Sequence, residues 1–288
     1  MISFKYIHSD KNTFLLEERN KIPYLTAPKL NALPGINHLF STRLGGVSTG
    51  NQASLNFSYK MDSSKENVYE NFKRVANLFG CSIDCIVGAD QTHTATVKVV
   101  DINNAGNGIT KEKEFFDVDG LVTNDPSVML FVTCADCVPI LLADPKKKVV
   151  SAVHSGWRGT CSGIARNAVE TMKNEFGSKV SDIVVAIGPS ICKNCYEVSE
   201  DLYDAFSDSS AYKNIDVDLF FEKGRSESKY QLDLHRANEL LLLESGILRE
   251  NIDITNTCTA CNSEILFSHR ASNGKRGGMG AFIKIQEE

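Results

Sequence analysis

Six short apolar runs between residues 86 and 153 constrain the fold of this chain most strongly. They are separated by turns rich in Asn, Gly, Asp and Pro, a pattern that is typical of β-strands. Helical patterns occur around this block at irregular intervals, which favours an α+β fold over a strictly alternating, doubly wound sheet. The expected strands are 86–87, 96–100, 120–123, 128–132, 138–142 and 149–153.

Apolar residues recur at helical spacing in two longer segments. A capping box of Ser63 and Glu66 predicts the start of a helix that ends at Gly80. A second helix begins at Thr160 or Ser162 and is closed by Gly177. We therefore expect mixed sheets flanked by helices in one compact domain, residues 37–288, on which N-terminal strands within residues 1–36 pack. Further helices are expected at 199–206 and 233–244, and further strands at 39–43, 183–187, 252–254, 265–267 and 281–283.

Composition narrows the classes of function. With 288 residues, 42% hydrophobic, the chain can bury a substantial core. The net charge of −5 provides no basic surface for a phosphate backbone, so nucleic acid is not an expected partner. Residues 1–14 lack the apolar core of a signal peptide, and the apolar stretch 128–143 is too short for a bilayer. Nine cysteines, an odd number, indicate reduced thiols and a cytoplasmic protein.

Three short motifs, each beside or within a strand-like run, carry candidate metal ligands. They are Gln91-Thr92-His93, Ala135-Asp136-Cys137 and the run from Val153 to Gly159 that contains His154. Two imidazoles and a thiolate suit zinc, and three protein ligands leave a coordination position open for water or substrate. This pattern predicts a catalytic zinc held by His93, Cys137 and His154, although any one of them could instead be an ordinary core residue.

Asp136 strengthens this interpretation because a carboxylate is costly to bury in an apolar run. We expect it to orient a metal-bound imidazole through the second ring nitrogen. Trp157 and Arg158 lie between a strand end and a helix start, where backbone N–H groups favour an anion such as phosphate. Packing of the tryptophan and a structural ion pair of the arginine are the simpler alternative, and Arg43 and Arg270 are equally ambiguous.

Together these motifs resemble the laccase-domain family, formerly called multicopper polyphenol oxidases and better described as purine nucleoside phosphorylases. The resemblance covers roughly residues 37 to 285 in order. It rests on 38–48 (HLFSTRLGGVS), 54–56 (SLN), 91–93 (QTH), 118–121 (VDGL), 135–139 (ADCVP), 152–159 (AVHSGWRG), 188–189 (GP), 196–198 (YEV) and 258–261 (CTAC) through 267–270 (FSHR).

This resemblance implies that His93, Cys137 and His154 are the metal ligands. It also implies phosphorolysis of purine nucleosides to free base and ribose 1-phosphate, with adenosine deaminase and methylthioadenosine phosphorylase activities. The resemblance further implies a fold similar to that of the toxin deamidases. It also implies that the bound metal is zinc, although copper binding is reported for the family. The expected catalytic residues are those three ligands and Asp136, and the expected substrate contacts are Arg43, Asn56, Gln91, Trp157, Arg158 and Arg270.

Three alternatives stay open from the sequence. A metal-free hydrolase or deamidase would use Cys137 as nucleophile and His154 as base, with Asp136 or Gln91 as the orienting group. A copper-dependent phenol oxidase would need more histidines than the six present. A non-enzymatic scaffold could hold a structural zinc. Three C-x-x-C pairs, at 134/137, 192/195 and 258/261, permit a second, all-cysteine site, which the absence of zinc-knuckle flanking residues disfavours.

Overall fold

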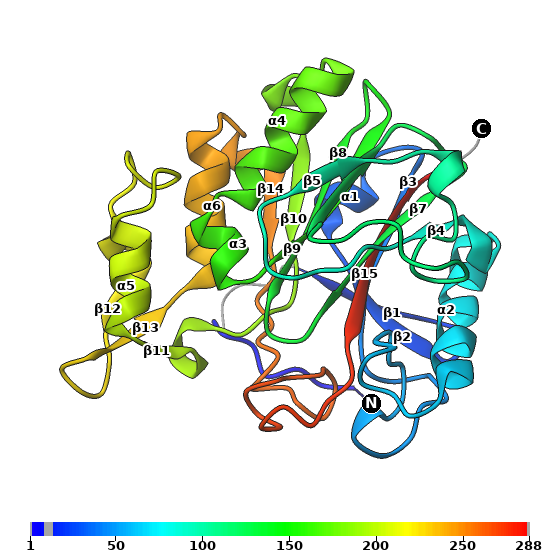
Figure 1. The fold of residues 1–288 in the computed structure, drawn as a ribbon, viewed down its shortest axis with the longest axis horizontal. Coiled ribbons are helices and arrows are strands. Elements are labelled where there is room, and N and C mark those ends of the chain that lie inside the picture. Colours follow the sequence, from blue (N-terminus) through cyan, green and yellow to red (C-terminus); the bar gives the residue numbers. More distant parts are fainter. Residues whose placement is uncertain (1, 9–13, 287–288) are drawn as a thin grey trace.

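Two six-stranded mixed sheets dominate the computed structural model, which describes residues 2–8 and 14–286 (Figure 1). A three-stranded sheet lies at one edge. The first sheet has the order β1 (Leu15–Arg19), β2 (Ile22–Thr26), β3 (Ile36–Ser41), β15 (Met279–Ile285), β7 (Met129–Cys134), β4 (Ile86–Val87). The second has the order β14 (Ile252–Ile254), β10 (Val184–Ile187), β8 (Val138–Asp144), β9 (Val149–Ser155), β6 (Gly120–Thr123), β5 (Val97–Val99). The small sheet is β11 (Glu197–Ser199), β13 (Lys229–Leu232), β12 (Phe221–Lys223).

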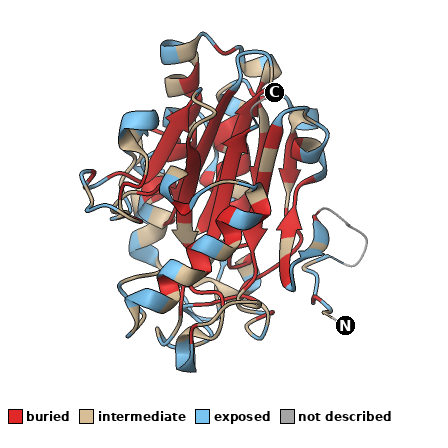
Figure 2. Cartoon of the chain, turned by 90° about the vertical axis from the view of Figure 1, so that its right-hand side faces the viewer, coloured by how far each residue is buried: buried red, intermediate tan, exposed pale blue. Residues whose placement is uncertain are grey.

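The two large sheets stack face to face, and helices cover their outer faces. Leu130 and Ile283 of the first sheet share one apolar cluster with Leu141 and Ala152 of the second. Helix α2 covers the first sheet, and α4 and α6 cover the second (Figure 1). The sheets therefore form the buried centre and the helices the outer layers, as the burial colours show (Figure 2). The helices are α1 (Pro28–Asn31), α2 (Lys65–Phe79), α3 (Trp157–Cys161), α4 (Ile164–Phe176), α5 (Glu200–Ser207) and α6 (Leu234–Glu244).

Local sequence explains the limits of α2. The Ser64 side chain accepts a hydrogen bond from the Asn67 backbone N–H, and Gly80 ends the helix at a φ of 68°. The N-cap is thus one residue later than the predicted Ser63. Phe72 on its apolar stripe contacts Phe131 of β7 edge to face, with ring centroids 4.9 Å apart. The stripe at helical spacing therefore fixes which face of the helix meets the sheet.

The expected α+β class and single domain are confirmed, and all six runs of the central block contain strands. The strand predicted at 265–267 is wrong, because these residues lie in an irregular loop whose apolar side chains fill the core. The helix predicted from Thr160 is interrupted, because Gly163 adopts a φ of 81° between α3 and α4. Helix α1 and the small sheet were not predicted.

The N-terminal strands belong to the first sheet, since β2 pairs with β3 and β1 pairs with β2. Of the segment predicted to carry no signal peptide, Met1 and residues 9–13 lie outside the described residues. Among the residues that the structure describes, no helix is both long and apolar enough to cross a membrane.

Candidate active site

The three predicted ligands meet where the chain passes between the sheets. His93 lies in the segment that leads from β4 in the first sheet to β5 in the second, and Cys137 lies in the link from β7 to β8. His154 stands near the end of β9, where it pairs with Pro139 at the start of β8. The strand registers thus bring three distant motifs to the same end of the stacked sheets.

The ligand atoms of the three residues are spaced as a single metal ion requires. One atom from each of His93, Cys137 and His154 lies within 4.8 Å of the other two, and Cys137 Sγ is 3.8 Å from His93 Nε2. A tetrahedral zinc separates its ligand atoms by roughly 3.3–3.8 Å. His93 is exposed whereas His154 is buried, so the cluster is open on the side of His93. The predicted three-ligand cluster is therefore present in the fold.

The backbone around this cluster is unusual. His93 and Asp136 both have positive φ, at 70° and 84°. Non-glycine residues in this region cost of order 1 kcal/mol or more and concentrate at functional sites. Gly156 gives the cluster its space, because a Cβ there would lie 2.5 Å from His93 Cδ2 and 3.1 Å from Cys137 Sγ.

Asp119, just before β6, connects two of the ligands. Its Oδ1 accepts from His154 Nδ1 at 2.7 Å and from the His93 backbone N–H at 3.1 Å. Its Oδ2 accepts from the backbone N–H groups of Thr92 and Thr94. His154 Nε2 is thereby the ring nitrogen left for a metal, and the His93 turn is fixed by the same carboxylate. Asp119 is 1% exposed, so both oxygens are committed to these partners.

Asp136 does not have the partner that we predicted. Its Oδ1 accepts from Thr259 Oγ1 at 2.5 Å, and its Oδ2 accepts from the Arg270 backbone N–H at 2.6 Å. The prediction that Asp136 orients a ligand imidazole is wrong, because Asp119 opposes His154 across the β6–β9 pairing. Asp136 instead joins the Cys137 link to the loops that contain Thr259 and Arg270.

The Cys137–His154 pair is strongly polarised. Burial raises the pKa of the Cys137 thiol, but the charges and hydrogen bonds of His154 and His93 outweigh it and lower that pKa to about 6. Burial lowers the pKa of His154, yet Cys137 and Asp119 raise it to about 9. Without a metal, the pair is therefore a thiolate and an imidazolium near neutral pH. A metal binds in place of the imidazolium proton, so its affinity rises with pH.

Comparison with known proteins agrees with this geometry. Residues 37–286 match the family described as "Multi-copper polyphenol oxidoreductase laccase". The chain belongs to this family. The curated "Purine nucleoside phosphorylase YlmD" of Bacillus subtilis is 35% identical over 249 residues, which are 86% of this chain and 88% of the relative. The "Purine nucleoside phosphorylase" of Deinococcus radiodurans is 36% identical over 264 residues, 92% and 93% of the two chains.

A solved structure supports the same assignment. The crystal structure of YlmD from Geobacillus stearothermophilus has a TM-score of 0.87 and 33% identity, and it covers 96% of this chain and 100% of its own. The resemblance to the laccase family predicted from the motifs is confirmed, and the names of the relatives support an enzyme. Their names give nucleoside phosphorolysis as the activity of those proteins.

Gln91 and Asn56, two of the six expected substrate contacts, use their side-chain amides to hold neighbouring loops. Gln91 forms two hydrogen bonds of 2.8 Å with the backbone of Thr133 in β7. Asn56 is fully buried, and its amide bonds to Ser58, Asp62 and Gly278. Both side chains therefore have a structural role in holding these loops in position.

Arg43 lines a cavity of about 240 Å³ together with Ser268, Ser272, Lys275 and Arg276, here called the Arg43 cavity. Arg43 donates to the carbonyls of Ala53 and Ser263 and stacks on Phe267. Burial lowers the pKa of Arg276, while the charges of Cys137 and Asp136 oppose this shift. Arg276 therefore lines the Arg43 cavity and lies near enough to Cys137 and Asp136 to feel their charges. The sequence does not single out Arg276, because it belongs to no predicted strand and to none of the motifs.

The remaining three candidates are Trp157, Arg158 and Arg270, and none of them lines the Arg43 cavity. Arg158 stacks on Trp157 at 4.3 Å, and Arg270 lies 5.2 Å from the Tyr196 ring centroid. Burial and the Cys137 charge raise the pKa of Tyr196 to about 12, while Arg270 and Arg158 oppose the rise. Both arginines and the phenol thus act on one region beside Cys137. Tyr196 and Asp119 are functional candidates without a predicted role, although both stood in the motifs of the family.

The two other buried histidines that the structure describes, His38 and His235, have structural surroundings. His38 Nε2 accepts from the Ala27 backbone N–H, and burial lowers the pKa of His38 to about 3. His235 bonds to Ser190. Among the residues described by the structure, no second cluster of three potential metal ligands contains histidine.

Proposed function

We propose that this protein is a zinc-dependent purine nucleoside phosphorylase that converts a nucleoside and phosphate to free base and ribose 1-phosphate. The open cluster of His93, Cys137 and His154 carries this proposal. The names of the laccase-family relatives give it the reaction. We also propose that the site deaminates adenosine and cleaves methylthioadenosine.

The donor set fits zinc. Two imidazoles and one thiolate match a three-ligand catalytic site, and Asp119 supplies the carboxylate that ligating histidines commonly have behind them. When bound, zinc would supply an electrophile that faces the purine or a water molecule. His93, Cys137 and His154 would hold it. The copper-oxidase alternative lacks support, since the described residues outside this cluster offer no further histidine site for oxygen chemistry.

Phosphorolysis requires a phosphate placed below C1′ of the nucleoside while negative charge gathers on the departing base. The Arg43 cavity supports a phosphate site because Arg43, Lys275 and Arg276 line it. The base would lie near the metal ligands, where Trp157 and Tyr196 offer aromatic faces and Arg158 and Arg270 offer positive charge. Arg276 lines the Arg43 cavity and also feels the charge of Cys137, so it would face the reacting sugar.

Replacing Arg276 with methionine tests this arrangement. We expect the KM for phosphate to rise about 10- to 100-fold, because a charged hydrogen bond contributes about 1.5–3 kcal/mol. The zinc content is expected to stay unchanged. Arg158→Met, which removes an exposed arginine that does not line the Arg43 cavity, is the matched comparison and should leave the KM for phosphate within about twofold. The opposite ranking would move the phosphate to Arg158.

A metal-free hydrolase that uses Cys137 as nucleophile is the second candidate. The low pKa of Cys137 beside His154 favours it, because a thiolate at neutral pH is what such an enzyme needs. Metal removal separates the two functions. The thiol route predicts equal or higher activity after chelation, whereas the proposed phosphorylase loses activity and regains it with zinc.

The deciding experiment incubates purified, zinc-loaded protein with adenosine, inosine, guanosine or methylthioadenosine, with and without phosphate, and identifies the products by chromatography. The proposal requires base release that depends on phosphate, with ribose 1-phosphate in equal amount. Inosine formed from adenosine without phosphate would support deamination. Base release that is indifferent to phosphate, or none from any nucleoside, would count against phosphorolysis.

A further inference from the structure

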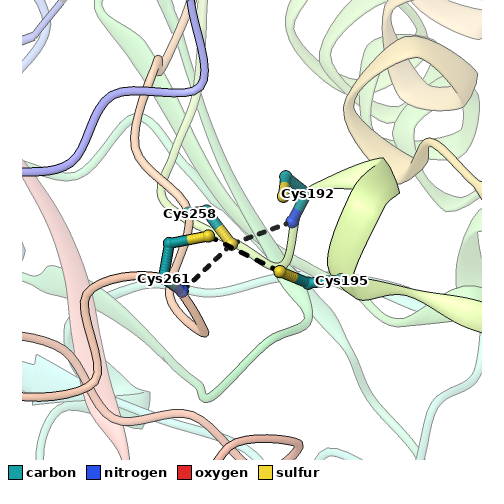
Figure 3. Close-up of side chains that lie close together, drawn as sticks. All are labelled: Cys192, Cys195, Cys258 and Cys261. Carbon is teal, nitrogen blue, oxygen red and sulfur yellow. Dashed lines mark hydrogen bonds between the residues drawn. The ribbon is translucent and has the colours of Figure 1, made fainter.

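Four cysteines that the candidate active site does not use form a second cluster. They are two C-x-x-C pairs, Cys192/Cys195 and Cys258/Cys261, which face one another from separate loops (Figure 3). All four sulfur atoms lie within 4.8 Å of one another, and those of Cys195 and Cys261 are 3.5 Å apart. All are free thiols. Four mutually close sulfurs make up one complete ligand set for a metal.

The fold explains why pairs so far apart in sequence meet. Strands β10 and β14 pair in parallel, with Ile187 opposite Ile254. Each C-x-x-C pair follows the end of its strand by a few residues, and the pairing continues past the strands as a bridge between Ser190 and Cys258. The Thr259 backbone N–H donates to the Ser190 carbonyl at 3.0 Å. The parallel register therefore places one pair directly beside the other.

We propose that Cys192, Cys195, Cys258 and Cys261 bind a structural zinc ion. A tetrahedral zinc with bonds of about 2.3 Å separates its sulfur ligands by about 3.8 Å, so the observed spacing needs only small side-chain movements. Two disulfides would bring sulfurs together in pairs and would not require all four to be mutual neighbours. The sequence disfavoured this site because the residues that flank the cysteines of zinc knuckles are absent. In this fold the β10–β14 pairing, and not such flanking residues, places the two C-x-x-C pairs side by side.

The surroundings suit thiolates. The backbone N–H groups of Cys192 and Cys261 both point at Cys258 Sγ, at 3.3 and 3.5 Å, an arrangement that stabilises a metal-bound thiolate. The guanidinium of Arg270 lies against the Cys195 carbonyl and partly offsets the negative charge of four thiolates. Cys192 and Cys258 are buried while Cys261 is exposed, which gives an ion a route of entry.

This second ion would position the candidate active site without contacting substrate. Ile191, next to Cys192, donates its backbone N–H to the Asp136 carbonyl, and Thr259, next to Cys258, donates its hydroxyl to the Asp136 carboxylate. Asp136 directly precedes Cys137. Four protein ligands leave no open coordination position, so the zinc would not bind substrate. It would cross-link the two cysteine loops, which in turn hold the β7–β8 connection that contains Cys137.

The test measures metal in the full-length protein, purified under reducing conditions without chelator, and it does not depend on the proposed activity. Native protein is expected to hold one zinc for each of the two clusters. Cys137→Ala is expected to lose one and keep the other. X-ray absorption at the zinc edge of this variant should show sulfur neighbours alone, at about 2.3 Å. The double variant Cys195→Ser/Cys261→Ser should keep a zinc with mixed nitrogen and sulfur neighbours.

Cys161→Ser is the matched control, since Cys161 is half-buried and lies outside both clusters, and it should keep both ions. Should the double variant fail to fold, the spectrum of Cys137→Ala still decides. The proposal is overturned if Cys137→Ala contains no zinc, if its zinc has nitrogen or oxygen neighbours, if iron occupies the site, or if mass spectrometry finds the four cysteines as disulfides.

Discussion

Cys137→Ala is expected to reduce phosphorolysis by at least about 100-fold and to remove zinc from the candidate active site. Loss of a group that only hydrogen-bonds to a metal ligand lowers metal affinity or activity about 10- to 100-fold. Loss of the ligand itself is therefore expected to have a larger effect. The thiolate is also the charge that raises the pKa of His154. Steady-state kinetics and zinc titration of the purified variant measure both effects.

Cys137→Asp separates the two explanations of such a loss. A carboxylate binds zinc but cannot serve as a thiol nucleophile, so partial activity and a retained zinc are expected if Cys137 is a ligand. A Cys137→Asp protein that binds zinc fully and has no activity would instead point to the thiol as the reacting group. Cys161→Ser, outside both clusters, controls for general effects of cysteine replacement and should match the native enzyme.

The cluster of candidate metal ligands was predictable because each of its residues belongs to a short motif of distinctive chemistry. Each of the three residues, His93, Cys137 and His154, follows or lies within a strand-like run. Residues at the ends of strands in two stacked sheets lie close to one another in space. The sheet order could not be predicted, since β3, β15 and β7 are neighbours in one sheet although they lie far apart in the chain. Long-range strand pairing depends on the whole core, and local patterns do not encode it.

The partners of the ligands were harder to predict than the ligands themselves. Asp136 and Asp119 are both carboxylates in apolar runs, and both are buried. Sequence proximity to Cys137 favoured Asp136 as the partner of an imidazole. In the structure the partner is Asp119, because the pairing of Gly120 with Val153 places Asp119 beside His154. Arg276 has no local signal at all, and only the folded C-terminal loop brings it near Cys137.

Asp119→Asn is expected to lower kcat/KM and zinc affinity about 10- to 100-fold each, although it changes few atoms. Each oxygen of Asp119 accepts from N–H donors on different sides, His154 and His93 at Oδ1 and Thr92 and Thr94 at Oδ2. An asparagine has one NH₂ group, which must face one of these sets of donors. Either the His154 ring or the His93 turn therefore loses its acceptor.

The same variant is expected to lose about 1–3 kcal/mol of unfolding free energy in the zinc-free state, because buried donors are left unsatisfied. Asp117→Asn is the matched control: Asp117 lies in the same turn and is exposed, and its carboxylate accepts from the Thr92 hydroxyl. Its φ of 56° suits asparagine equally well. Chemical denaturation and zinc titration of both variants should show a large effect at Asp119 and almost none at Asp117. Equal effects would mean that Asp119 does not act through His154 and His93.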